Sequence, residues 1–122
     1  MKIETYIKEP THIPAMGNLA VKMVRDSVSS FINNDLELAN EVVRADDKMD
    51  ELFDEVKQEL IAYIKKDGNN GEQAITLMMI GKYLERIGDH AINICEYTKL
   101  MEKKNILFSE RAQGEIEQMR AI

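Results

Sequence analysis

Hydrophobic residues recur at intervals of three and four positions through most of this chain, which is the period of an α-helix with one buried face. The first such segment follows Pro14, a residue that suits the opening turn of a helix because that turn leaves its N–H groups unpaired. The polar run from Asn33 to Asp35 ends the segment. The pattern predicts a first helix that buries Met16, Leu19, Ala20, Met23, Ser27 and Phe31.

A second helix is predicted from about Asp35 to Lys66. Asn34 and Glu37 have the spacing of a capping box at its start, and basic residues followed by Gly68 suit its end. Its apolar positions fall within about 120° of arc, so the helix has one apolar face. That face contains Leu38, Val42, Ala45, Met49, Leu52, Phe53, Val56, Leu60 and Ile64.

A third helix is predicted from about Glu72 to Lys103, after a second capping box at Asn70 to Gln73. Gly81 and Gly88 each lower helix propensity by about 1 kcal/mol, and their spacing of seven indicates a place where another helix approaches closely. The residues expected to pack inward are Leu77, Ile80, Leu84, Ile87, Ala91, Ile94 and Met101.

The last stretch, FSERAQGEIEQMRAI, can begin a short fourth helix with Ser109 as its N-cap. It is short and has little apolar content, so we expect it to dock on another surface or to fray. The whole chain, residues 1–122, is then a single domain with a core over about 14–103 and a C-terminal extension over 109–122.

These elements predict an all-α fold, an elongated antiparallel three-helix bundle. Helices of roughly 30 residues are near 45 Å long at 1.5 Å per residue, too long for a compact globin-like packing. Three helices leave a narrow core, and an apolar flank that includes Met78, Ile92 and Leu100 would be covered by a second copy or a partner. A homodimer is expected on that ground.

Charge and composition exclude several classes of protein. The formal net charge is −6 and the pI is near 5.0, without the clustered basic face that nucleic-acid binding requires. No apolar run approaches a membrane span, and the N-terminal MKIETYIKEP lacks the apolar core of a secretory signal. Cys95 is the only cysteine, so it is expected to be a small core residue in a reducing compartment, which favours the cytoplasm.

Acidic residues form a stripe in LERIGDHAINICE, where Glu85, Asp89 and Glu96 fall within roughly 40° of one another on a helix. The spacing of Glu85 and Asp89 is repeated by Asp46 and Asp50. If the two helices are adjacent and antiparallel, these four carboxylates converge. Such oxygen ligands suit Mg, Ca or Mn, iron when several carboxylates bridge, and zinc with help from imidazole.

Acids at this spacing also have a purely structural interpretation, a solvated helix face with Arg44 and Arg86 as counter-charges. The nearest imidazole, His90, points about 100° away from Asp89 on a helical wheel, so it is poorly placed as a ligand. The sequence has no glycine-rich phosphate loop, serine elbow, Cys/His pair or Glu-x-x-His pair in the third helix. We therefore expect a protein that is not an enzyme.

The run LMMIGKYLERIGDHAINICEYTKL, with ANEVVRADDKMDELFDEVKQELIAYI, closely resembles the two signature helices of the PhoU family of phosphate-signalling regulators. The resemblance covers about Met16 to Leu100. It implies an all-helical fold, usually of two three-helix repeats, whose acidic motifs bind iron or zinc clusters. It assigns one motif to Glu85 and Asp89 and the other to Asp46 and Asp50, with Asn93 and Glu96 on the same stripe as second-tier metal ligands.

Only one such repeat fits in 122 residues. The chain is then either a single-repeat member that dimerises or a piece of a longer protein, such as the cytoplasmic tail of a sodium/phosphate cotransporter-like protein. The resemblance implies a cytoplasmic regulator of phosphate uptake and of the phosphate-starvation response. It would bind the ATPase subunit of a phosphate ABC transporter and a sensor histidine kinase, with no turnover. The alternatives are a metal-storage or metal-dependent catalytic bundle and a structural dimerisation module.

Overall fold

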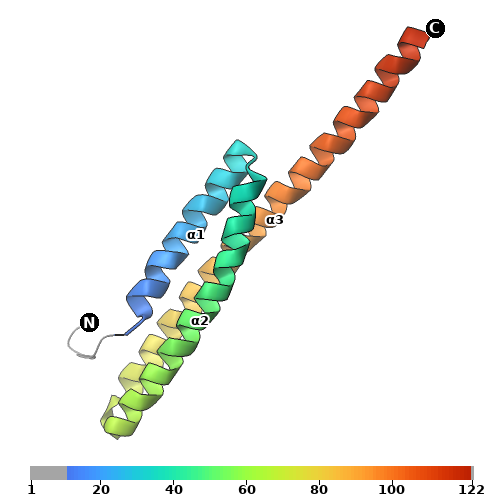
Figure 1. Ribbon diagram of the computed structural model, residues 1–122. Helices are drawn as coiled ribbons and strands as arrows, with labels where there is room; N and C mark the ends of the chain where they lie inside the picture. The colour runs from blue at the N-terminus through green and yellow to red at the C-terminus, as the bar shows by residue number, and fades with distance from the viewer. Residues whose placement is uncertain (1–10, 122) are drawn as a thin grey trace.

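The computed structural model describes residues 11–121 as three α-helices joined by tight turns. Consecutive helices run antiparallel, so α1 and α3 point the same way along α2 (Figure 1). The predicted all-helical, antiparallel three-helix architecture is confirmed. The N-terminal MKIETYIKEP, in which no secretory signal is expected, lies outside the described residues. The elements are α1 (Ile13–Asn33), α2 (Leu36–Lys66), a 3-10 turn η2 (Gly68–Asn70) and α3 (Gly71–Ala121).

The turn between α1 and α2 is tight because Asn34 adopts a left-handed conformation with a φ of 53°. Asparagine tolerates this region better than most residues with a side chain. Asp35 is the N-cap of α2, and its side chain accepts a hydrogen bond of 3.0 Å from the backbone N–H of Leu38. The end of α1 and the start of α2 agree with the prediction, but the N-cap of α2 is Asp35, one residue later than the Asn34 of the predicted capping box.

The turn between α2 and α3 is closed by side chains of two polar residues. Asp67 Oδ1 accepts from the backbone N–H of Asn69 at 3.0 Å, and Asn70 Nδ2 donates to the carbonyl of Tyr63 at 2.9 Å. The C-cap of α2 is Asp67 and not Gly68. Asn70 holds the end of α2, a different role from the capping box that its spacing to Gln73 predicted.

Most of the predicted core of α1 and α2 is confirmed. The buried apolar residues of these helices are Met16, Ala20, Met23, Ala39, Val42, Met49, Leu52, Phe53, Val56 and Leu60. Two predictions at the helix ends are wrong, because Phe31 is 50% exposed and Ile64 is 38% exposed. Both lie close to a turn, and Phe31 faces an open groove beside α3 instead of the core.

The buried face of α3 consists mainly of small residues. Gly81 and Gly88 are buried, and so are Ala74 and Cys95, which lie seven residues before and after them. A second buried row contains Leu77, Ala91 and Thr98. The predicted inward positions Ile87 and Met101 are instead 40% and 44% exposed, because the two neighbouring helices pack close against the small residues. The core position predicted for Cys95 is confirmed.

The fourth helix predicted after Ser109 is wrong, because α3 continues without interruption to Ala121. Gly114, the residue with the lowest helix propensity in this stretch, costs only about 1 kcal/mol, and most of its neighbours are good helix formers. The side chain of Asn34 hydrogen-bonds Glu102, which lies level with the α1–α2 turn. Beyond that level α3 projects past the other two helices (Figure 1). Within residues 11–121, no helix has the length and apolar character needed to cross a membrane.

Candidate functional site

The packing of α2 on α3 sets the register between the predicted acidic pairs. Gly81 lies against the ring of Phe53, and Gly88 lies near the end of the Met49 side chain. Because the helices are antiparallel, this register places Asp50 level with Glu85 and Asp46 level with Asp89. The four predicted carboxylates therefore lie along the edge between α2 and α3, near enough that Glu85 and Asp89 raise the pKa of Asp46 and Asp50. We call this group the acidic cluster (Asp46, Asp50, Glu85 and Asp89).

Electrostatics within the acidic cluster disfavour full ionisation. Partial burial raises the pKa of Asp46 above its usual range, and the charges of Asp50 and Asp89 raise it further. The pKa of Asp50 is also raised, first by desolvation and then by the charge of Glu85. Like charges held together at a partly desolvated edge favour either protons or a bound cation.

The cluster has one counter-charge and one unpaired oxygen. Lys82 Nζ lies 2.8 Å from Glu85 Oε1, and Arg86 lies over the ring of Tyr83 at 5.6 Å from its centroid. Asp46 Oδ1 is buried without a hydrogen-bond partner. In residues 11–121 no three His, Cys, Asp or Glu side chains are arranged to hold one metal ion. The donor chemistry therefore fits a hard cation, but the carboxylates would have to turn toward it, and Glu85 would have to leave Lys82.

The second-tier residues follow the acidic cluster along α3, with Asn93 four and Glu96 seven positions after Asp89. Asn93 and Glu96 line a shallow hollow of about 570 Å³ on α3, together with His90, Tyr97 and other residues of the same helix. Both are exposed, as are Asp50 and Asp89, so they stay second-tier candidates beside the acidic cluster.

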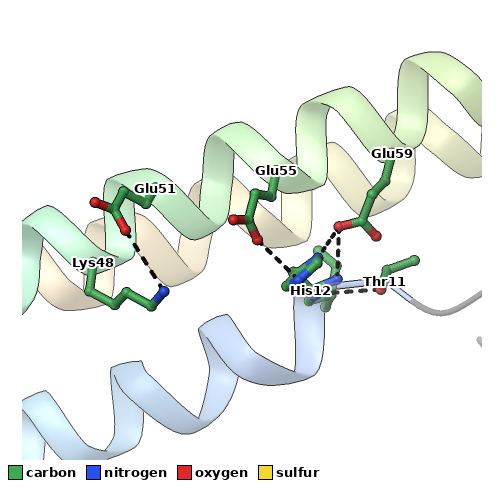
Figure 2. Close-up of polar contacts among 7 residues, drawn as sticks. Thr11, His12, Lys48, Glu51, Glu55 and Glu59 are labelled. Carbon is green, nitrogen blue, oxygen red and sulfur yellow. Dashed lines mark hydrogen bonds and ion pairs between the residues drawn. The ribbon is translucent and has the colours of Figure 1, made fainter.

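Sequence reasoning missed a second polar site, which joins the start of α1 to α2 (Figure 2). His12 Nε2 lies 3.0 Å from Glu55 Oε2, and Nδ1 contacts the carboxylate of Glu59. The backbone N–H of His12 also donates to Glu59 Oε1 at 3.2 Å. The bond to Glu59 and the charges of both glutamates raise the pKa of His12, while desolvation and Lys48 act in the opposite direction. The spacing of Glu55 and Glu59 on one face of α2 was a usable signal, but nothing in the sequence links it to His12.

Comparison with known proteins connects this fold to a family. The profile of the PhoU domain matches residues 13–98, which include all of α1 and α2 and the part of α3 that packs in the bundle. The match therefore covers both helices that contribute to the acidic cluster.

Three relatives are each named "Phosphate-specific transport system accessory protein PhoU homolog". The Clostridium acetobutylicum protein is 36% identical over 68% of this chain and 38% of its own length. The Deinococcus radiodurans protein is 32% identical over 74% of this chain and 42% of its own length. The Aquifex aeolicus protein is 39% identical over 68% of this chain and 38% of its own length. The chain thus spans about two fifths of the length of the curated relatives it matches.

Proposed function

This chain belongs to the PhoU family, and we propose that it is a regulator of phosphate uptake that acts by binding other proteins. The observation that carries the proposal is the match of the PhoU domain to 13–98, the whole three-helix bundle. The relatives' names describe an accessory role in a phosphate-specific transport system, which supports a regulatory function without turnover.

The partners we propose are the ATPase subunit of a phosphate ABC transporter and the sensor histidine kinase of the phosphate-starvation response. Contact with both would take place in the cytoplasm. The edge between α2 and α3 is the surface that we assign to this contact. It is strongly acidic, it is formed by the two helices that carry the family resemblance, and its charge would change whenever a cation binds.

The acidic cluster is the proposed place for that cation, with iron or zinc as the metals that the family resemblance suggests. Two observations support binding: desolvation and mutual repulsion, which together raise the pKa of Asp46 and Asp50, and the buried Asp46 Oδ1 without a partner. A bound cation would neutralise that repulsion and provide a partner for the oxygen. Asp46 and Asp50 would approach it from α2, and Glu85 and Asp89 from α3.

Pull-down of the transporter ATPase subunit and of the sensor kinase tests the regulatory proposal. Each partner should bind the intact chain and should bind less to a variant with the four residues of the acidic cluster replaced by alanine. The matched control replaces Glu51 and Glu110, which are also exposed acids, and should bind as the intact chain does. Failure of the intact chain to capture either partner, with or without added metal, would contradict the proposal.

Metal content tests the cation site separately. Protein purified without chelator should contain iron or zinc, and the quadruple alanine variant should contain far less while the Glu51 and Glu110 control retains it. Equal metal content in all three proteins would show that the acidic cluster does not hold the metal. The regulatory proposal would then rest on the pull-down alone.

A further inference from the structure

The large apolar side chains of α3 lie mostly outside the bundle. Because small residues occupy its buried face, several of its larger side chains are exposed on another face. Tyr83 is 57% exposed, Tyr97 is 62% exposed, and Ile87 and Met101 are each more than one third exposed. These residues recur at spacings of four, ten and four, which place them within about 80° of arc on one face of the helix. An exposed apolar stripe of this extent marks an interaction surface in a protein that is otherwise highly charged.

Part of this stripe forms a groove with α1. The groove has a volume of about 420 Å³ and is lined by Val28, Phe31, Ile94, Tyr97 and Met101. Val21 and Ile87, each seven residues before a lining residue on the same helix, are both at least 40% exposed. By helical spacing they extend the apolar surface along α1 and α3 toward the middle of the bundle.

The projecting part of α3, which we call the tail (residues 103–121), has a stripe on the same face. Phe108 is 75% exposed, Ile116 is 44% exposed and Met119 is 72% exposed. With Ala112 they fall within about 80° of arc, and this arc continues the line of Tyr97 and Met101. Phe108 follows Met101 by seven residues, and Met119 follows Ala112 by seven, the spacing that pairs one helix with another.

We infer that two copies of this chain form a two-fold dimer in which the tail of each copy lies in the α1–α3 groove of the other. Because the groove and the tail stripe share one face of α3, an antiparallel pairing of the two α3 helices brings each stripe onto the other copy's groove. With Phe108 level with Tyr97 of the second copy, Ala112 comes within one residue of Ile94 and Met119 within one residue of Ile87.

The length of the tail suits this arrangement. At 1.5 Å per residue the tail extends roughly 28 Å beyond Glu102, and in the antiparallel pairing it reaches back along the whole groove. A helix of this length is only marginally stable in water without a partner. In the described part of the chain α1 ends and α2 begins level with the start of the tail, so neither helix packs against it.

Charge also favours the second copy as the occupant. Residues 103–122 contain four basic and three acidic side chains, a net charge of +1. Residues 11–102 contain ten basic and seventeen acidic side chains, a net charge of −7. Docking the tail of one copy on the bundle of the other therefore brings opposite net charges together. A contact between the two bundles would instead bring two negative net charges together.

The exposed apolar side chains set the area that this contact can bury. A fully buried aromatic side chain contributes about 150 to 250 Å². Because Phe31, Tyr97 and Phe108 are 50%, 62% and 75% exposed, they supply roughly 280 to 470 Å² per copy, and the exposed aliphatic side chains of the groove and tail contribute toward the rest of the roughly 800 Å² per partner of a standard interface. The two-fold axis makes every contact twice, once for each tail. The flank that the sequence suggested for dimerisation is less suitable, because Met78 and Ile92 are partly buried against the chain's own core.

The test compares two neighbouring tail residues that are both exposed but face different sides. Phe108→Lys should weaken the dimer at least about tenfold, as the loss of a central aromatic anchor does. Leu107→Lys, at a residue 57% exposed on another face of the tail, should leave the dimer unchanged. Sedimentation velocity over a dilution series of the full chain measures both, with circular dichroism to show that the variants stay helical. A monomeric intact chain, or equal effects of the two variants, would overturn the inference.

Cysteine cross-linking tests the register independently of stability. Tyr97 and Phe108 of one chain are roughly 16 Å apart along α3, too far for a disulfide, so only a second copy can join them. The Tyr97→Cys, Phe108→Cys double variant should form covalent dimers on oxidation, and the Tyr97→Cys, Leu107→Cys control should not. Phe108→Cys alone should also stay unlinked. Efficient linking of that single variant would show that the two tails pack against each other, which would contradict the docking of each tail in the other copy's groove.

Discussion

Gly81 on α3 lies directly against the ring of Phe53 on α2: a Cβ atom at this glycine would approach Phe53 Cε1 to 2.8 Å. The ring is 3% exposed and has little freedom to move. This close approach sets the register between α2 and α3, and through it the meeting of the four carboxylates of the acidic cluster. A core contact therefore determines the geometry of the candidate site.

Alanine at the two helix-packing glycines should have opposite effects. Gly81→Ala should lower the free energy of unfolding by about 1 to 2 kcal/mol, because overpacking against Phe53 outweighs the gain in helix propensity. At Gly88 the nearest atoms to a new Cβ are those of Met23 at 3.5 Å, an ordinary contact. Gly88→Ala should therefore raise stability by up to about 1 kcal/mol. Urea unfolding measures both, and a change of the same sign in the two variants would contradict this account.

His12 should make the attachment of α1 to α2 dependent on pH. Its pKa is raised above the ordinary 6.5 by Glu59 and Glu55, so the folded state binds the proton more tightly than the unfolded state does. The stabilisation is fully present below the ordinary pKa and is lost as the pH rises through the folded pKa.

Thermal melts of the intact chain and of His12→Gln measure this effect. The intact chain should melt at the higher temperature at acidic pH, and the difference should shrink toward alkaline pH. Glu59→Gln serves as a control by NMR titration, in which the pKa of His12 should fall. A difference in melting temperature that is constant with pH would show that the contact does not depend on the proton.

The sequence predicted the fold better than it predicted the faces of α3. Periodicity located all three helices of the bundle. In α1 and α2 the apolar positions recur clearly at intervals of three and four, with polar positions between them. In α3 the close approach of another helix that was predicted at Gly81 and Gly88 is confirmed, but Ile87 and Met101, predicted as inward because they are hydrophobic, lie outside that small-residue face. An exposed apolar flank was predicted, but at Met78, Ile92 and Leu100, of which Met78 and Ile92 pack against the core, whereas Tyr83 and Tyr97 of the observed outer face were not named.

The candidate site was predictable in part. The spacing of the two acidic pairs identified the residues, but whether the pairs face each other depends on the packing of Phe53 against Gly81, which sequence spacing does not determine. The contact of His12 with Glu59 joins positions 47 residues apart, and no local pattern indicates it. Ser109 was interpreted as a helix start because a cap residue in the middle of a helix looks the same as one at its end.

The N-cap of α2 provides a test of the turn after α1. Asp35→Ala removes the bond to the Leu38 N–H and should cost about 0.5 to 2 kcal/mol, whereas Asp35→Asn retains a good capping group and should cost far less. Chemical denaturation compares the two variants. Equal losses would mean that the negative charge matters more than the cap.

The acidic cluster should destabilise the metal-free protein at neutral pH. The folded pKa values of Asp46 and Asp50 are raised, so the folded state gains protons before the unfolded state does as the pH falls. Stability of the chelator-treated protein should therefore increase as the pH falls through these folded pKa values, until the unfolded carboxyls also become protonated.

Replacing one carboxylate should reproduce that gain at neutral pH. Asp50→Asn should stabilise chelator-treated protein by about 0.2 to 0.5 kcal/mol for each like-charge pair that it removes. Glu51→Gln, which instead removes a contact of 3.7 Å with Lys48, should not stabilise it. If the cluster binds a cation, added metal should make the intact chain more stable than Asp50→Asn. The intact site then gains the binding free energy, whereas the variant has lost one ligand. Thermal melts with chelator and with added zinc or iron measure the stability of the intact chain and of Asp50→Asn under both conditions. If Asp50→Asn were less stable than the intact chain under chelator, that result would contradict the repulsion among these carboxylates.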